Sequence, residues 1–161
     1  MTLSRKIADA VEAGAASIAD LPRAVEAEAG PHRLALRMTA LGPVGVAFDA
    51  LEFAQGGRPD LSAADLRSWG DRLAARLTYL MEPLVVLEVD AEAGEAELRS
   101  RAPTARADRR SFTEVRLRRG GTLHLRRLAF DEAARRRGVV PCQMTREALE
   151  RLADDLVACA P

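Results

Sequence analysis

Apolar residues recur at helical spacing near the start of the chain. Between residues 4 and 20 they are separated by four, seven and three positions: Ile7, Val11, Ile18 and Leu21. This spacing places them on one face, so it predicts a first amphipathic helix with Thr2 or Ser4 as its N-cap. Because proline is tolerated in a first helical turn, we expect Pro22 to begin a separate short helix that ends at Gly30 and Pro31.

Two further helices are predicted in the middle and at the end of the chain. Ser62 is followed three residues later by Asp65, a pairing typical of a capping box. The apolar positions after it lie on one helical face, and we expect this helix to end at Pro83: Leu66, Trp69, Leu73, Leu77 and Leu80. The last helix is expected to begin at Thr145 with these residues directed inward: Leu149, Leu152, Leu156 and Val157.

Alternation of apolar and polar residues predicts two groups of strands. The first is a pair, residues 32–41 and 44–48, joined by a turn at Gly42 and Pro43. The second contains residues 84–90, residues 95–101 and the two strands of a later hairpin. We expect the following side chains to face the core: Val85, Leu87, Val89, Ala96 and Leu98. Residues 102–110, polar and interrupted by proline, are predicted to be a connection.

The hairpin lies in the stretch RSFTEVRLRRGGTLHLRRLAF, residues 110–130. A three-residue loop of Arg119, Gly120 and Gly121 places leucine and valine opposite leucine on the core side. That register predicts the following cross-strand pairs: Leu117 with Leu123, Val115 with Leu125, Glu114 with Arg126, Arg116 with His124, and Phe112 with Leu128. A two-residue turn is less consistent, because it would place a leucine opposite His124.

The predicted fold is α+β, with an antiparallel sheet of about six strands, two plus four. Helices from the N-terminal, middle and C-terminal parts of the chain are expected to pack mainly on one face. A chain of 161 residues fits one domain, residues 1–161, with a core large enough to need no disulfide or metal. Aromatic residues make up only 4%, so the core should be aliphatic.

Charge is distributed unevenly along a chain whose net charge is zero. Residues 99–137 contain 13 arginines and 4 acidic residues, whereas residues 1–98 contain 9 basic and 16 acidic residues. This excess of arginine defines a candidate surface for an anionic partner. Its candidate residues are Arg99, Arg101, Arg116, Arg118, Arg126, Arg135, Arg136 and Arg137.

Acidic residues on the same face offer another interpretation of these arginines. Four acidic residues are predicted to project beside them, so in this interpretation the arginines pair with acids within the fold: Glu88, Asp90, Glu95 and Glu97. The chain contains one lysine and 23 arginines, and a GC-rich genome produces this bias without selection for function. The sequence is consistent with both interpretations.

No catalytic, cofactor-binding or metal-binding motif is present. Cys142 precedes the last helix, where a helix N-terminus lowers a thiol pKa, and His124 is its candidate base, but a small buried cysteine is the commoner case. His32 and His124 lack HxH, HxxxH or CxxC spacing, so we expect no metal site. We therefore expect no cofactor and favour a non-enzymatic protein.

Function is predicted only at the level of a class. The leading hypothesis is a binding or accessory module that acts through protein–protein contacts, including self-association into a homodimer through the sheet face or the first helix. The first alternative is binding of nucleic acid or another polyanion through residues 99–137. The second is a small-ligand protein or enzyme with an unrecognised site. Without a signal sequence or membrane span, we expect a cytoplasmic location and no membrane partner.

Overall fold

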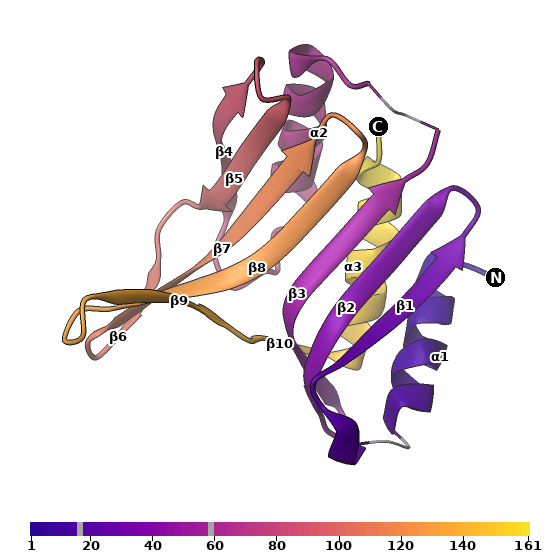
Figure 1. Cartoon of the computed structure of the whole chain (residues 1–161), viewed down its shortest axis with the longest axis vertical. Coiled ribbons are helices and arrows are strands. Elements are labelled where there is room, and N and C mark those ends of the chain that lie inside the picture. The colour runs from indigo at the N-terminus through magenta and orange to yellow at the C-terminus, as the bar shows by residue number, and fades with distance from the viewer. Residues whose placement is uncertain (16–17, 58–59) are drawn as a thin grey trace.

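A computed structural model describes residues 1–15, 18–57 and 60–161 of the chain. Over these residues it shows three α-helices and a ten-stranded sheet in which every pairing is antiparallel (Figure 1). The helices are α1 (Leu3–Ala15), α2 (Ala63–Arg76) and α3 (Arg146–Cys159), with a 3-10 helix η1 (Ile18–Asp20). The strands are β1 (Arg23–Ala29), β2 (His32–Leu41), β3 (Gly45–Gln55), β4 (Leu84–Asp90), β5 (Glu95–Ser100), β6 (Thr104–Arg106), β7 (Arg109–Arg118), β8 (Thr122–Asp131), β9 (Arg136–Val140) and β10 (Cys142–Thr145).

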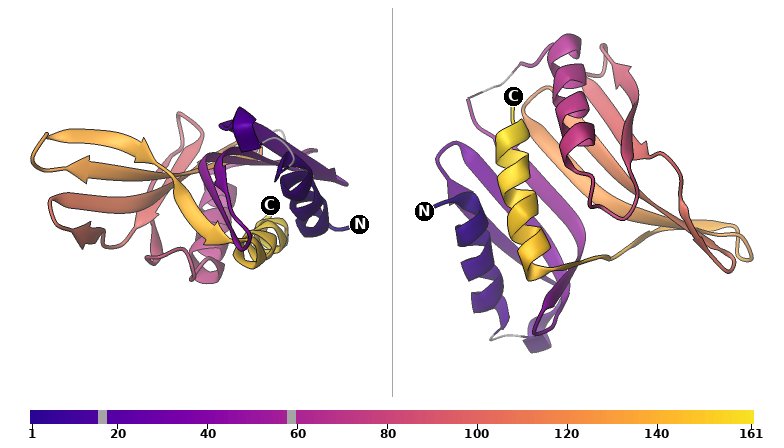
Figure 2. Two further views of the ribbon diagram at one scale, coloured as in Figure 1. Left: turned by 90° about the horizontal axis from the view of Figure 1, so that it is seen from below. Right: turned by 180° about the vertical axis from the view of Figure 1, so that it is seen from behind.

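The predicted α+β class is confirmed, with more strands than the expected six. The main strand order is β1-β2-β3-β8-β7-β5-β4. All three helices lie on one face of this sheet: α1 packs on β1 and β2, α2 packs on β4 and β5, and α3 lies between them (Figure 2). We call the opposite side, which these helices leave uncovered, the open face.

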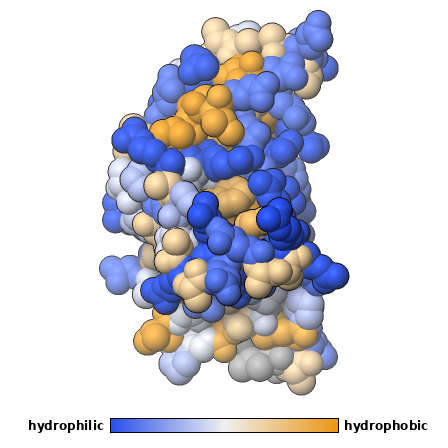
Figure 3. Space-filling view, turned by 90° about the vertical axis from the view of Figure 1, so that its left-hand side faces the viewer, coloured by the Kyte–Doolittle hydropathy of each residue, from blue (hydrophilic) through white to orange (hydrophobic). Residues whose placement is uncertain are grey.

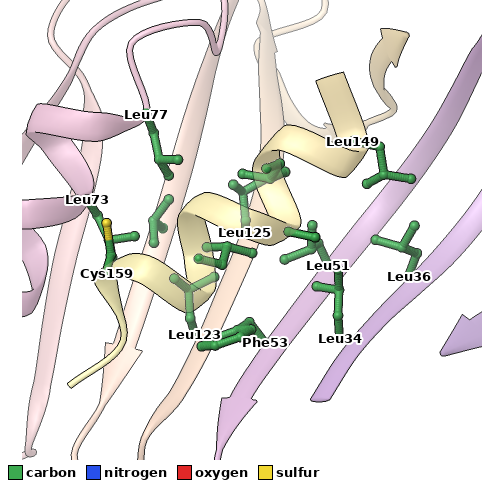
Figure 4. Packing of buried hydrophobic residues seen from close by; sticks show 14 of the residues in the cluster. Leu34, Leu36, Leu51, Phe53, Leu73, Leu77, Leu123, Leu125, Leu149 and Cys159 are labelled. Atoms are coloured by element: carbon green, nitrogen blue, oxygen red, sulfur yellow. The ribbon is translucent and has the colours of Figure 1, made fainter. Parts of the chain in front are cut away.

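The core lies between the helices and the sheet and consists mainly of leucine. Figure 4 shows leucines of β2, β3 and β8 directed at leucines of α3 and of the α2 end. The apolar face of α1 is also covered, since Leu3, Ile7 and Val11 are at most 3% exposed. Among the described side chains of α1, these apolar residues are therefore unavailable to a partner.

The predicted helix starts are correct at all three helices. Helix α1 begins at Leu3, directly after Thr2, whose hydroxyl accepts a hydrogen bond from the Arg5 backbone at 3.3 Å. Ser62 accepts a hydrogen bond from the Asp65 backbone, and the Asp65 side chain accepts one from the Ser62 backbone, which completes the capping box of α2. Thr145 caps α3 by accepting from the Ala148 backbone at 3.0 Å. Helix α1 ends at Ala15, earlier than predicted, and the side chain of Ile18 lies outside the described part of the chain.

The predicted short helix after Pro22 is wrong, because residues 23–29 form strand β1. Val25 and Ala27 are buried, whereas Glu26 and Glu28 are exposed, so the segment alternates with the period of a strand. A turn with Gly30 at φ 59° then joins β1 to β2 as a hairpin. Backbone hydrogen bonds to β2 thus decide the structure of this segment.

Helix α2 ends at Arg76 rather than at Pro83, although Leu77 and Leu80 are buried as predicted. Beyond it, strand β4 changes register between Val86 and Glu88. This β-bulge shifts the alternation by one residue, so Leu84, Val86 and Val89 face the core. Contrary to the prediction, Val85 lies opposite Arg99 on the open face, and Leu87 is 54% exposed.

The predicted connection at residues 102–110 is partly a strand. Strand β6 pairs with the first residues of β7, and β9 pairs with the last residues of β8, so both extend the hairpin beyond the helices (Figure 1). We call this extension, residues 101–111 and 129–140, the arm. After Pro141 the chain continues as β10, which pairs with β3.

Candidate interaction surface

The β7–β8 hairpin has the register that its sequence predicts. All five predicted cross-strand pairs are present, including Glu114 with Arg126 and Phe112 with Leu128. Gly121 adopts φ 85°, and its N–H donates to the Arg118 carbonyl at 2.9 Å. A glycine in the left-handed region therefore closes the three-residue loop.

A buried carboxylate neutralises the arginines at the centre of the hairpin. The Glu114 side chain is 3% exposed and accepts from Arg126 Nε at 2.6 Å and from Arg116 Nη2 at 3.3 Å. Burial alone would raise the pKa of Glu114, but the hydrogen bonds and charges of Arg126 and Arg116 outweigh burial and lower that pKa. These two arginines are engaged within the fold.

Two further predicted arginines are also paired on the open face. Arg118 Nε lies 3.4 Å from Glu95, and Arg99 Nη2 lies 2.6 Å from Glu97. The expected like-charged neighbours are present, Glu88 opposite Glu97 and Asp90 opposite Glu95. Four of the eight candidate arginines thus form ion pairs with acidic residues of the same chain, as the second interpretation of the sequence predicted: Arg99, Arg116, Arg118 and Arg126.

The other four candidates belong to the arm and form no ion pair within the described residues. They are Arg101, Arg135, Arg136 and Arg137. The Arg137 guanidinium lies 5.4 Å from the centre of the Phe112 ring, which also contacts Arg99 at 5.0 Å. Phe112 is 9% exposed, so this ring is covered rather than free to stack on a base.

Three arginines of the arm, Arg106, Arg109 and Arg110, were missed by the sequence analysis. Arg109 of β7 has Arg106 as its cross-strand neighbour on one side and Asp131 on the other. Asp131 also lies opposite Arg136 of β9. This row places three cations around one carboxylate on the same side of the arm. Alternation of side chains across residues 104–111 was the signal for a strand pair here. The turn between the two strands was not recognised, because Ala107 adopts φ 52° at a position where glycine or asparagine is typical.

The arm is attached to the body of the protein by a buried ion pair. Arg127 donates to both Glu82 carboxylate oxygens, at 3.0 and 2.9 Å, and both side chains are at most 8% exposed. Thr104 at the beginning of the arm and Ser100 also donate to Glu82, each at 2.8 Å. These contacts link the loop before β4 to β5, β6 and β8.

Carboxylates gather at the far end of β4. Glu88, Asp90 and Glu92 are exposed, and within the described residues none of them forms an ion pair. We call these three residues the acidic edge. The Asp90 carboxylate accepts from the backbone of Glu92 and Ala93, which fixes the β4–β5 turn.

Cys142 and His124 do not form a catalytic pair. Cys142 is buried in the core on the helix side, and burial raises the pKa of its thiol to about 11. His124 alternates with the buried Leu123 and Leu125, so it lies on the open face, where its Nε2 is 3.8 Å from Glu52. Over the described residues, no group of three histidine, cysteine or carboxylate side chains is arranged to hold a metal.

Two hollows bear on the small-ligand alternative. A cavity of about 50 Å³ is lined by Tyr79, Cys142 and Arg127, but Arg127 is already paired with Glu82. A cleft of about 380 Å³ on the open face contains two internal ion pairs, Arg37 with Asp49 and Arg126 with Glu114. In both hollows the charged groups compensate one another.

Comparison with known proteins yields no family model, no curated protein and no solved structure that matches this chain. Among the described residues, no helix combines the length and apolar character needed to cross a membrane. The unpaired arginines of the arm and the neighbouring β4 edge are therefore the surfaces from which a function is argued.

Proposed function

We propose that this chain is a non-enzymatic binding module that acts through protein–protein contacts, with the arm as the element that binds an acidic surface of its partner. The observation that carries the proposal is the set of exposed arginines in the arm that form no ion pair within the described residues, among them Arg101, Arg106, Arg135 and Arg136. Arginine is enriched where proteins recognise carboxylates, because its planar group binds two oxygens at once.

Nucleic acid is the rival partner, and two features favour protein. The central arginines Arg116 and Arg126 are held by Glu114, so the basic surface of the hairpin is interrupted at its centre. The covered ring of Phe112 offers no stacking platform for bases.

The test is fluorescence anisotropy with a labelled polyglutamate peptide and, separately, a labelled nucleic acid duplex, at low and high salt. The arm variant Arg106→Gln with Arg135→Gln is compared with the control Arg5→Gln with Arg23→Gln, which removes the same charge from α1 and β1. We expect salt-sensitive peptide binding that the arm variant weakens by about tenfold and the control retains. Absence of peptide binding at low salt contradicts the proposal, and tighter duplex binding supports the polyanion alternative.

A further inference from the structure

Strand β4 lies between two exposed surfaces of opposite charge. The arm is fixed at the Leu84 end of the strand, where the Arg101 N–H donates to the Pro83 carbonyl at 2.7 Å and Thr104 donates to Glu82. The acidic edge begins at Glu88 and lies at the other end of the strand. Seven residues of strand separate these ends by about 20 Å.

The outer side of β4 has no strand partner in the described part of the chain. Strand β4 is the last in the sheet order and pairs with β5 alone. At its middle, the bulge exposes Leu87, and the view onto this side shows hydrophobic residues at the surface among hydrophilic ones (Figure 3). An unpaired edge with an exposed leucine is a surface that associates readily.

The opposite edge of the sheet is protected. Lys6, the single lysine of the chain, donates from Nζ to the Glu28 carbonyl of β1 at 2.7 Å. Lysine at a sheet edge discourages pairing with another strand, and helix α1 packs beside it. The two ends of the main strand order therefore differ, and of these two β4 is the one that combines apolar exposure with flanking charge.

A two-fold symmetric contact requires a surface that is complementary to itself. A positive group on one side of the axis must meet a negative group at the same distance on the other side. An axis through Leu87 fulfils this condition, because it exchanges the arm end of β4 with the acidic end. It brings the arm of each copy to the acidic edge of the other.

We infer that this chain forms a two-fold dimer about Leu87 of β4, in which the arm of each copy binds Glu88, Asp90 and Glu92 of the other. The inference rests on the proposed function, because it uses the same arm and names its partner as a second copy. The charge distribution supports a second copy as the partner, because the chain contains both a basic and an acidic part. Residues 99–137 have nine more basic than acidic residues, residues 1–98 have seven more acidic than basic residues, and the whole chain is neutral.

Because of the bulge, the contact relies on side chains more than on a continuous ladder of backbone hydrogen bonds. Leu87 packs near its own symmetry mate at the axis, and the charges on either side fix the orientation. Dimerisation should therefore weaken as salt increases, since exposed ion pairs are screened.

The experiment measures the dimer dissociation constant by sedimentation equilibrium for two reversal variants. The arm-reversal variant is Arg106→Glu with Arg135→Glu, and the edge-reversal variant is Glu88→Lys with Glu92→Lys. None of the four side chains forms an ion pair within the described residues, so thermal stability should be retained. We expect each variant alone to dimerise at least about tenfold more weakly than wild type.

Mixing the two variants gives the decisive result. In the mixed dimer, reversed arm meets reversed edge at one contact, and native arm meets native edge at the other, so both contacts are attractive. We expect the mixture to dimerise with an affinity near that of wild type. A control reversal at the other edge of the sheet, Arg5→Glu with Arg23→Glu, should leave dimerisation unchanged.

A monomeric wild type at high concentration overturns the inference, and so does a dimer that neither reversal weakens or that mixing fails to restore. The proposed function is judged separately, with the polyglutamate peptide and the edge-reversal variant, whose arm is free. If the chain binds the peptide but stays monomeric, the proposed function is supported and the acidic partner is another protein. Failure of peptide binding together with charge-dependent dimerisation limits the arm to self-association.

Discussion

Glu82 and Arg127, 45 residues apart in the chain, form a two-point ion pair beneath the base of the arm. Ser100 and Thr104 also donate to Glu82, and Arg127 donates to Thr113, which completes the network around the pair. Burial alone would raise the pKa of Glu82, but hydrogen bonds from Arg127, Ser100 and Thr104 outweigh burial and lower that pKa.

Removing one partner of this pair should strongly destabilise the fold. Arg127→Met leaves the Glu82 carboxylate buried without its cation, and we expect a loss of about 3–5 kcal/mol in the free energy of unfolding. Urea denaturation measures this loss. The control is Arg110→Met, which removes an exposed ion pair with Glu132 of the same 2.9 Å length and should cost about 0–1 kcal/mol. Equal losses in both variants would contradict the importance of burial.

The unfolding free energy should decrease in acid. The pKa values of Glu82 and Glu114 are lowered by folding, so their stabilisation is complete above the ordinary value of 4.5 and is lost as pH falls through the depressed values. Wild type should therefore lose stability progressively below about pH 4.5. Glu82→Gln should lose less over that range, although it is less stable at neutral pH. Denaturant unfolding across a pH series measures both, and parallel curves would refute the linkage.

Glu114 should determine whether the open face attracts anions. Glu114→Gln releases Arg116 and Arg126, and we expect it to tighten binding of a labelled duplex at low salt by about threefold to tenfold. Fluorescence anisotropy measures this gain. Glu147→Gln on the exposed side of α3 changes the net charge equally and serves as the control. An identical gain in both variants would indicate a general charge effect rather than release of the two arginines.

The two cysteines should be unreactive in the folded protein. Burial raises the pKa of Cys142 to about 11 and also raises the pKa of Cys159, so both thiols are protonated and covered at neutral pH. We expect labelling by a thiol reagent to be at least about a hundredfold slower in the native state than in denaturant. Fast native labelling of Cys142 would reopen a role for this thiol in catalysis.

The hairpin could be predicted from its sequence because its information is local. Gly120 and Gly121 fix the loop, and the loop fixes which residues face each other across β7 and β8. The same holds for the starts of α2 and α3, where Ser62 and Thr145 bond to the backbone three residues later.

The errors lie where local signals are ambiguous or absent. Pro22 is compatible with both a helix start and a strand start, and pairing with β2 selects the strand. Strands β6 and β9 were missed because each is short and the turn at Ala107 contains no glycine. The bulge in β4 depends on how that strand pairs with β5, so alternation alone placed Val85 and Leu87 on the wrong side.

The sequence by itself determined the α+β class, the hairpin register and the existence of a strongly basic segment, since these follow from spacing, turn chemistry and composition. The tertiary structure decided which arginines are free. Arg99, Arg116, Arg118 and Arg126 meet acids across neighbouring strands, whereas the arm carries its arginines beyond the reach of those acids. Coulombic pairing depends on distance in space, and for residues far apart in the chain only the fold sets that distance.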